Sequence, residues 1–167
     1  LDGPIGAELL EAMNGKGLVA LAFFEAGGRS ICTVSQPVRR LEDLKGLRIR
    51  VPPSALASAV FEAWGARPIK LPFSQTGNAL ATHLIDAAEN NLLAYASAEH
   101  YRHAPQLALT HHSFSPEVLV MSRRSWDALS GAEQAMLRRA AREARPMMRD
   151  MWQQREERVE ALLRLGG

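Results

Sequence analysis

Short apolar runs alternate with helical patterns along most of the 167 residues of the chain. The run lengths are those of strands, and turn residues separate the runs. We expect strands at 17–24, 29–35, 47–51, 67–72, 107–112 and 117–122, and a further short strand within 84–90. We expect helices at 55–64, 74–83 and 92–103, and a long helix after Ser130. This alternation is typical of βαβ units, so it predicts an α/β fold with a mostly parallel sheet.

Several residues mark where the predicted elements begin and end. Ser54 is a natural N-cap for the helix at 55–64. Ser130 and Glu133 have the spacing of a capping box at the start of the long helix. The Gly27-Gly28 pair follows a continuous apolar run and is expected to separate the first two strands.

Composition excludes some classes of protein. Lys and Arg number 20 against 18 Asp and Glu, and this near balance does not favour nucleic-acid binding. No apolar run in the sequence is long enough to cross a bilayer. The single cysteine, Cys32, cannot form an internal disulfide and fits a reducing or an oxidising compartment. The chain begins with Leu1 rather than Met, so a leader could have been removed.

The stretch DLKGLRIRVP, residues 43–52, raises the main functional question. Side chains alternate between the two faces of a strand, so Leu47, Ile49 and Val51 share one face and Arg48 and Arg50 share the other. A solvated strand face is one interpretation. An anion clamp is the other, because a guanidinium group is a planar fork of donors that matches a carboxylate. Alternation does not decide which arginine would bind the anion.

The histidines and the lone cysteine do not predict a metal centre or a catalytic site. His100 and His103 are spaced to share a helical face, but nothing fixes a third ligand, and His111-His112 lie elsewhere. Cys32 is interpreted as a small apolar strand residue. The sequence contains no nucleophile elbow, no phosphate loop, no dinucleotide fingerprint and no zinc-protease motif. We therefore expect no metal, no cofactor and no catalytic residues, and binding is favoured over catalysis.

Asp86, Glu89 and Asn90 form a polar cluster just after a short apolar run. Turn chemistry explains such a cluster, because Asp and Asn side chains bond their own backbone in turns. A ligand-facing loop explains it equally well.

Several stretches occur in the order and spacing of one family. They are GLVALAFFEAGGRSICT, PVRRLEDLKGLRIRVP, WGARPIKLPFSQTGNAL, IDAAEN, LALTHH and SWDALSGAEQAMLRRAAREA. Together they resemble the periplasmic solute-binding proteins of TRAP transporters, the DctP family. The resemblance implies two α/β lobes in a Venus-flytrap arrangement with a ligand cleft, and a long C-terminal helix. It also implies a periplasmic receptor, not an enzyme, that delivers a small organic acid to the membrane subunits of a sodium-driven carrier.

The resemblance also implies which residues bind the ligand: Arg50, Arg29, Asn90, Phe73 and Glu89. Arg50 lies where the family's arginine pairs with the ligand carboxylate, whereas Arg48 falls on a looser position and is expected to be structural. Arg29 follows the glycines of the first crossing strand, and Phe73 is the aromatic residue that packs over the ligand. Asn90 is the expected hydrogen-bond partner, with Glu89 beside it.

The sequence departs from the family pattern near these residues. Gln75 replaces a usual glutamate, His83 replaces a usual glycine, and Ala87-Ala88 replaces Gly-Gln. Because neighbouring side chains select among acids, the identity of the acid and its number of carboxylates stay open.

The resemblance covers the C-terminal portion of the family's chain. Residues 1–26 would end the first lobe, 27–115 would form the second, ligand-binding lobe, and 116–167 would hold a returning strand and the long helix. We expect exposed apolar surface and a possible homodimer. Two alternatives stay open. One is a ligand-sensing regulatory domain of the same plan, and the other is an α/β enzyme that uses His83, Asp86 or 111–112.

Overall fold

The computed structural model describes residues 1–166. The chain divides into two compact units. The first comprises Leu1–Gly27 and Ser115–Arg155, and the second comprises Gly28–Phe114 and the chain from Glu156 onward. In the described residues, no helix is both long enough and apolar enough to span a membrane.

The first unit is mainly helical. Its elements are α1 (Pro4–Met13), η1 (Asn14–Lys16), the first part of β1 (Leu18–Thr33), the last part of β5 (Gln106–Ser122), α5 (Arg123–Asp127) and most of α6 (Gly131–Gly166). The predicted capping box opens α6: Ser130 N–H donates to Glu133 Oε2 at 2.8 Å, and Glu133 N–H donates to Ser130 Oγ at 3.3 Å. Large apolar side chains are exposed here, including Ile5, Met147 and Met151. Self-association through them stays a prediction.

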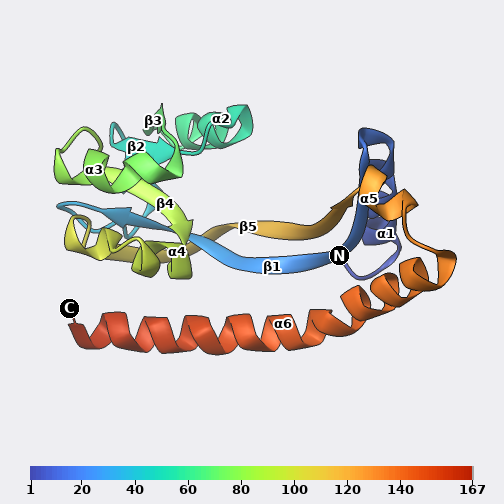
Figure 1. The fold of residues 1–167 in the computed structure, drawn as a ribbon. Helices are drawn as coiled ribbons and strands as arrows, with labels where there is room; N and C mark the ends of the chain where they lie inside the picture. The colour runs from blue at the N-terminus through green and yellow to red at the C-terminus, as the bar shows by residue number, and fades with distance from the viewer. Residues whose placement is uncertain (167) are drawn as a thin grey trace. The chain divides into compact units, whose positions relative to one another are not determined.

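The second unit holds the remaining elements. They are η2 (Leu41–Leu44), β2 (Arg48–Val51), α2 (Ala55–Ala63), β3 (Arg67–Lys70), η3 (Phe73–Gln75), α3 (Thr76–Ala81), β4 (Ala87–Asn91), α4 (Leu92–Ser97) and η4 (His100–Arg102). The sheet has the order β3-β2-β4-β1-β5 (Figure 1). β2 pairs parallel with both β3 and β4, whereas β1 pairs antiparallel with β4. The predicted α/β class is confirmed, with a mixed sheet.

Two predicted breaks in the strands are wrong. β1 runs without interruption through Gly27-Gly28, and β5 joins the segments predicted at 107–112 and 117–122. Gly27 adopts a φ of +68°, which glycine accepts at little cost, and the strand continues through the pair. β1 and β5 are neighbours in the sheet, and their pairing sustains both strands where the apolar pattern lapses.

Apolar side chains pack on both faces of the second unit's sheet. One core contains Ile31, Leu44, Ile49, Val51, Phe61, Ala66 and Ala87, with α2 as its cover. The other contains Cys32, Ala79, Leu80, Ile85, Ala88, Leu92, Tyr95 and Ala104, with α3 and α4 as its cover. The predicted N-cap of α2 is confirmed, since the Ser54 side chain accepts a hydrogen bond from Ala57 N–H. The polar residues that the sequence singled out project from a sheet covered on both sides.

Candidate functional site

Arg50 is a buried cation near the end of β2. Ile49 and Val51 point into the core under α2, so Arg50 points to the opposite face, as the alternation predicts. The residue is only 3% exposed. Its Nε donates to the carbonyl of Leu71 at 3.0 Å, and within residues 1–166 its two terminal nitrogens have no hydrogen-bond partner. Burial lowers the pKa of Arg50, because a charge loses favourable hydration inside the protein.

Arg48 shares that face but is engaged differently. Its Nε donates to Asp86 Oδ2 at 2.9 Å and a terminal nitrogen donates to Asp86 Oδ1, so the pair is bidentate. The backbone N–H of Arg48 also donates to Asp86. The hydrogen bond from Arg48 lowers the pKa of Asp86. Arg48 therefore ties the start of β2 to the residue before β4, which is the structural role expected of it.

Phe73 and His100 lie beside the guanidinium group of Arg50. The Arg50 Cζ atom lies 6.0 Å from the centroid of the Phe73 ring. The His100 ring meets Phe73 edge-on, with centroids 5.7 Å apart. Phe73 is 45% exposed, whereas His100 is buried, and burial lowers the pKa of His100. Arg50 thus has an open aromatic face on one side and a neutral imidazole within the fold.

A pocket opens next to Arg50. Its empty space, including the open mouth, is about 300 Å³, and the part that the centre of a water molecule can reach is about 10 Å³. The lining residues are Ser30, Cys32, Arg50, Thr76, Ala88, Glu89, Asn90, Leu92, Tyr95, His100 and Leu107. Arg50 and Asn90, two of the predicted ligand-binding residues, therefore border this cavity, and Glu89 also lines it although its carboxylate is bound to Arg29.

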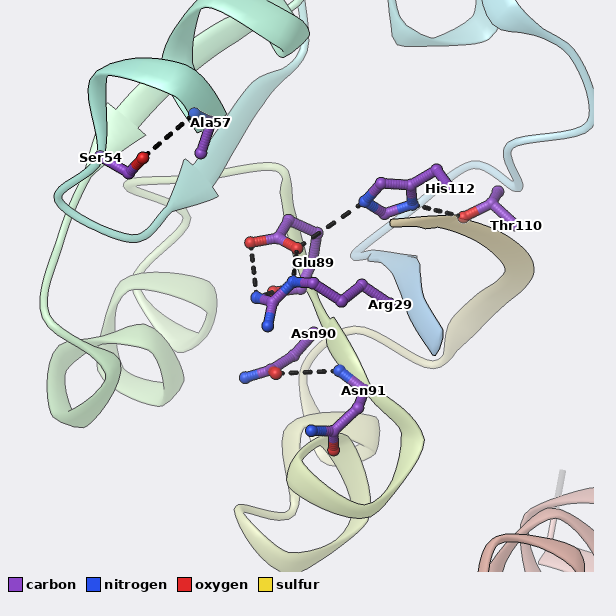
Figure 2. Close-up of polar contacts among 8 residues, drawn as sticks. All are labelled: Arg29, Ser54, Ala57, Glu89, Asn90, Asn91, Thr110 and His112. Atoms are coloured by element: carbon purple, nitrogen blue, oxygen red, sulfur yellow. Dashed lines mark hydrogen bonds and ion pairs between the residues drawn. The ribbon is translucent and has the colours of Figure 1, made fainter. Parts of the chain in front are cut away.

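Glu89 binds Arg29 on the adjacent strand. Arg29 Nε and one terminal nitrogen donate to the two Glu89 oxygens at 2.5 and 2.8 Å. His112 Nε2 lies 3.7 Å from the same carboxylate, and Figure 2 shows Glu89 between the imidazole and the guanidinium group. Burial raises the pKa of Glu89, but His112 and Arg29 together outweigh it and the pKa is lowered. Glu89 is therefore a buried carboxylate with its charge matched inside the fold.

Asn90 projects to the other side of β4 from Glu89, as the alternation of a strand requires. Its Oδ1 accepts from Asn91 N–H at 2.8 Å. The Asn91 side chain in turn accepts from Ala94 N–H and caps α4. The side-chain oxygen of Asn90 is thus bonded to the next residue, and the side-chain NH2 group remains a donor at the pocket.

The structure separates what the sequence grouped. Asp86, Glu89 and Asn90 form one cluster in the sequence, yet each has a different partner: Arg48, Arg29 and Asn91 N–H respectively. Local backbone bonding holds for Asn90, which accepts from Asn91 N–H, but not for Asp86, whose backbone partner Arg48 lies 38 residues away. Glu89 and Asn90 belong to β4 rather than to a loop, and their contact with a ligand stays a prediction.

The departures from the family pattern lie at positions with different surroundings. His83 adopts a φ of +54°, a left-handed conformation in which glycine is most comfortable. Ala87 and Ala88 point into opposite cores of the sheet, so small apolar residues fit there. Gln75 ends the exposed turn η3, beside Thr76. Only Ala88 of these positions lines the pocket.

Three of the residues considered for catalysis, Cys32, Asp86 and His112, are buried or held by other contacts. Within residues 1–166, no group of three His, Cys, Asp or Glu side chains could hold a metal ion. Burial raises the pKa of Cys32 to about 12, so the group is a thiol at neutral pH. Asp86 is occupied by Arg48, and His112 packs edge-on against Phe61 and Trp64.

Sequence reasoning missed Ser30, Thr76 and His100 as pocket residues. Strand alternation alone could not have found Ser30, because its place in the pocket follows from the β1–β4 register, in which it lies opposite Asn90. His100 was considered only as a metal ligand. A turn at η4 buries it beside Phe73, and no local pattern predicts this.

The family model for "Bacterial extracellular solute-binding protein, family 7" matches residues 1–166. The 2,3-diketo-L-gulonate-binding periplasmic protein YiaO of Escherichia coli is 36% identical over 159 residues, which cover 95% of this chain and 48% of that protein. The sialic acid-binding periplasmic protein SiaP of Vibrio cholerae is 30% identical over 133 residues, 80% of this chain and 40% of that protein. The chain spans about half the length of the curated relatives it matches.

Solved structures agree with the sequence matches. A TRAP periplasmic solute-binding protein from Bradyrhizobium, in complex with galacturonate, aligns with a TM-score of 0.94 and 47% identity over 100% of this chain and 56% of its own. One from Pseudomonas putida with bound D-glucuronate aligns with a TM-score of 0.94 and 38% identity over 99% of this chain and 55% of its own. The resemblance drawn from the sequence motifs is confirmed. This chain belongs to family 7 of the bacterial extracellular solute-binding proteins, the DctP family.

Proposed function

We propose that this chain forms the ligand-binding part of a periplasmic receptor for a sugar acid, which it delivers to the membrane subunits of a TRAP transporter. Family membership supports the class of protein, and the curated relatives YiaO and SiaP are named periplasmic binding proteins. Similar proteins of known structure hold galacturonate or glucuronate. These ligands share a carboxylate on a ring of hydroxyl groups, which is the chemical class we assign to the ligand of this chain.

The proposal rests mainly on the two terminal nitrogens of Arg50, which still have hydrogen bonds to donate. The Nε–H of this buried guanidinium is fixed by Leu71, and its two terminal nitrogens have no partner among residues 1–166. A buried charge is costly unless it is paired, so the fold supports a cation that an incoming carboxylate would complete. A carboxylate can accept two parallel hydrogen bonds from such a fork.

The neighbouring side chains suit the rest of a sugar acid. The exposed ring of Phe73 offers a flat surface for the C–H face of a pyranose. The amide of Asn90 can donate to a ring hydroxyl, and Glu89 lies at the same pocket with Arg29 bound to it. We assign these four residues, with Arg50, to the ligand shell. We likewise assign the ligand lobe to residues 27–115.

The proposal contains no chemical step, because the family is one of substrate-binding proteins. The bound acid would be released unchanged. Incubation with the protein should leave the proton NMR spectrum of galacturonate or glucuronate intact, whereas appearance of a product would make the protein an enzyme.

Isothermal titration calorimetry of the purified full-length protein tests the proposal. D-galacturonate and D-glucuronate would be compared with the uncharged sugar D-galactose. Arg50→Ala should weaken uronate binding by roughly 2–5 kcal/mol, the usual range for removal of one partner of a buried charge pair. Arg48→Ala is the matched control, because it removes a guanidinium from the same strand face that already has its own carboxylate.

The outcomes separate the parts of the proposal. Binding of a uronate but not of galactose, lost in Arg50→Ala and kept in Arg48→Ala, supports both ligand class and clamp. Equal affinity in Arg50→Ala and the parent would refute the clamp. Absence of binding to any carboxylate in the panel would refute the assignment of a sugar-acid receptor.

A further inference from the structure

Two buried hydroxyl groups in the pocket beside Arg50 are not used by the ligand shell described above. Ser30 is 3% exposed and Thr76 is 1% exposed. Both line the pocket, and within residues 1–166 neither Ser30 Oγ nor Thr76 Oγ1 has a hydrogen-bond partner. Buried polar side chains in folded proteins nearly always have one, so a pair of them in one cavity needs an explanation.

The fold fixes both hydroxyl groups on the Arg50 side of the sheet. Ser30 lies opposite Asn90 in the β1–β4 register, and it is two residues from Cys32, which packs in the core on the same side as Ala88. Ala88 is the register partner of Arg50 on β2. Thr76 begins α3, the helix that covers this face. The pocket is therefore bounded by a cation with spare donors and two hydroxyls with spare capacity.

The size of the cavity restricts what can occupy it. The volume of about 10 Å³ that the centre of a water molecule can reach matches the minimum for a single water molecule and is too small for a sugar ring. An apolar cavity of this size would stay dry, but a buried water is retained where two to four polar groups surround it. Tyr95 lines the same cavity, but its hydroxyl donates to the Ala104 carbonyl at 2.9 Å and is already satisfied.

The chemistry of the groups favours water as the link between them. Arginine can only donate hydrogen bonds, whereas a hydroxyl both donates and accepts. A water molecule can accept from the guanidinium and from one hydroxyl while it donates to the other. We propose that this pocket binds one water molecule shared by Ser30, Thr76 and Arg50, and that this water positions the guanidinium for the ligand. Ser30 and Thr76 are then positioning residues. The ligand part of this inference rests on the proposed function, whereas the water site does not.

The first test is made without ligand. Thr76→Val keeps the shape of the side chain and removes the hydroxyl. If the water is bound, this substitution breaks one of its hydrogen bonds and should lower the melting temperature by about 2–4 °C. If the hydroxyl is merely unsatisfied, its removal relieves a buried polar group and should leave the melting temperature unchanged or raise it, which would overturn the proposal.

A double-substitution cycle then tests whether the hydroxyls share one water. Ser30→Ala and Thr76→Val should be non-additive, because loss of either hydroxyl weakens the same site. Additive effects would overturn the shared site. A crystal structure at high resolution gives the direct check: electron density for a water within hydrogen-bond distance of Ser30, Thr76 and Arg50 supports the proposal, and a dry cavity refutes it.

The positioning role is tested by the affinity for D-galacturonate. Thr76→Val should weaken binding about tenfold, and Thr76→Ser, which restores the hydroxyl, should keep it within about threefold of the parent. A role in packing alone would not distinguish the two variants in this way, so equal affinities would overturn the positioning role. If the parent protein binds no uronate, the proposed function and the positioning role fall together. The ligand-free measurements then decide the water site by themselves.

Discussion

Two arginines, Arg29 and Arg50, lie on opposite sides of the sheet at β4 and differ in their hydrogen-bond partners. On one side, Arg29 forms a bidentate pair with Glu89, and His112 adds a third polar contact to the same carboxylate. On the other side, Arg50 is more deeply buried than Arg29 and has only the Leu71 carbonyl as a hydrogen-bond acceptor in residues 1–166. Arg29 is thus hydrogen-bonded to a carboxylate, whereas Arg50 is attracted to Glu89 only through space and donates to no carboxylate in residues 1–166.

This difference teaches where the fold keeps its binding capacity. A cation that is paired within the protein contributes to stability and has little left to offer a ligand. A buried cation without a carboxylate lowers stability and gains most when an anion arrives. The comparison therefore predicts opposite signs for the loss of charge on the two sides of β4.

The largest expected effect is on the paired side. Glu89→Gln removes the carboxylate and leaves the largely buried Arg29 guanidinium without its counter-charge. The loss of one partner of a buried pair should reduce the free energy of unfolding by roughly 3 kcal/mol. Urea denaturation followed by circular dichroism measures this loss.

A second variant shows whether the charge itself is responsible. Arg29→Met combined with Glu89→Leu removes both partners and should recover much of the stability that Glu89→Gln alone loses. If the double variant is at least as unstable as Glu89→Gln, the pair acts through something other than its matched charges.

Removal of the Arg50 charge should have the opposite effect on the stability of the ligand-free protein. Arg50→Met fills a similar volume without a charge, so the ligand-free protein should become as stable as the parent or more stable, by up to about 2 kcal/mol. The same variant should lose the stabilisation that D-galacturonate gives the parent. Thermal unfolding with and without the uronate measures both effects in one experiment.

Arg48→Met is the matched control for this variant. It removes a guanidinium from the same face of β2, but from one that already has Asp86 as its partner. It should bring no gain in stability and leave the response to the uronate unchanged. A large loss of ligand-free stability in Arg50→Met would show that Arg50 is a structural residue and would remove the contrast.

Strand periodicity predicted part of this contrast and could not predict the rest. Alternation placed Arg48 and Arg50 on one face, and the structure confirms that placement. What separates the two arginines is long-range: Asp86 reaches Arg48, whereas Phe73 and His100 close around Arg50. The local sequence does not show which side chain from a distant segment will contact each arginine.

The same limit explains the other differences between expectation and structure. Glu89 and Asn90 are adjacent in the sequence, and alternation alone shows that they point to opposite sides of β4. The partner of Glu89 lies 60 residues away on β1, and only the sheet order brings it there. The expected break at Gly27-Gly28 is wrong because strand pairing outweighs the local signal of two glycines.

Acidification sharpens the comparison on the Arg50 side. Burial, then the charges of Arg50 and His103, lower the pKa of His100 from 6.5. Below about pH 6.5 the unfolded chain therefore binds a proton that the fold resists, so stability should fall as the pH drops from 7 through 6.5 toward the lowered pKa. The slope contributed by one such group is at most roughly 1.4 kcal/mol per pH unit.

His100→Gln tests this assignment, with His83→Gln as the control because His83 is exposed and is not among the groups that shift the pKa of His100. Unfolding free energies between pH 7 and pH 5 should depend less steeply on pH in His100→Gln than in the parent. The control should keep the parent's slope. Identical slopes in all three proteins would show that His100 is not the group that disfavours protonation.

The smallest expected effect separates a buried pair from an exposed one. Asp86→Asn removes the charge that faces Arg48, but these side chains are 34% and 42% exposed, so water replaces much of the lost interaction. The amide oxygen of the new residue can still accept from the Arg48 backbone N–H. The loss of stability should therefore be a small fraction of the loss in Glu89→Gln, and 1 M NaCl should abolish it, because salt screens exposed charges far more than buried ones. Urea denaturation at low and high salt measures both losses. A loss in Asp86→Asn that rivals Glu89→Gln and survives high salt would mean that exposure does not distinguish the two arginine–carboxylate pairs.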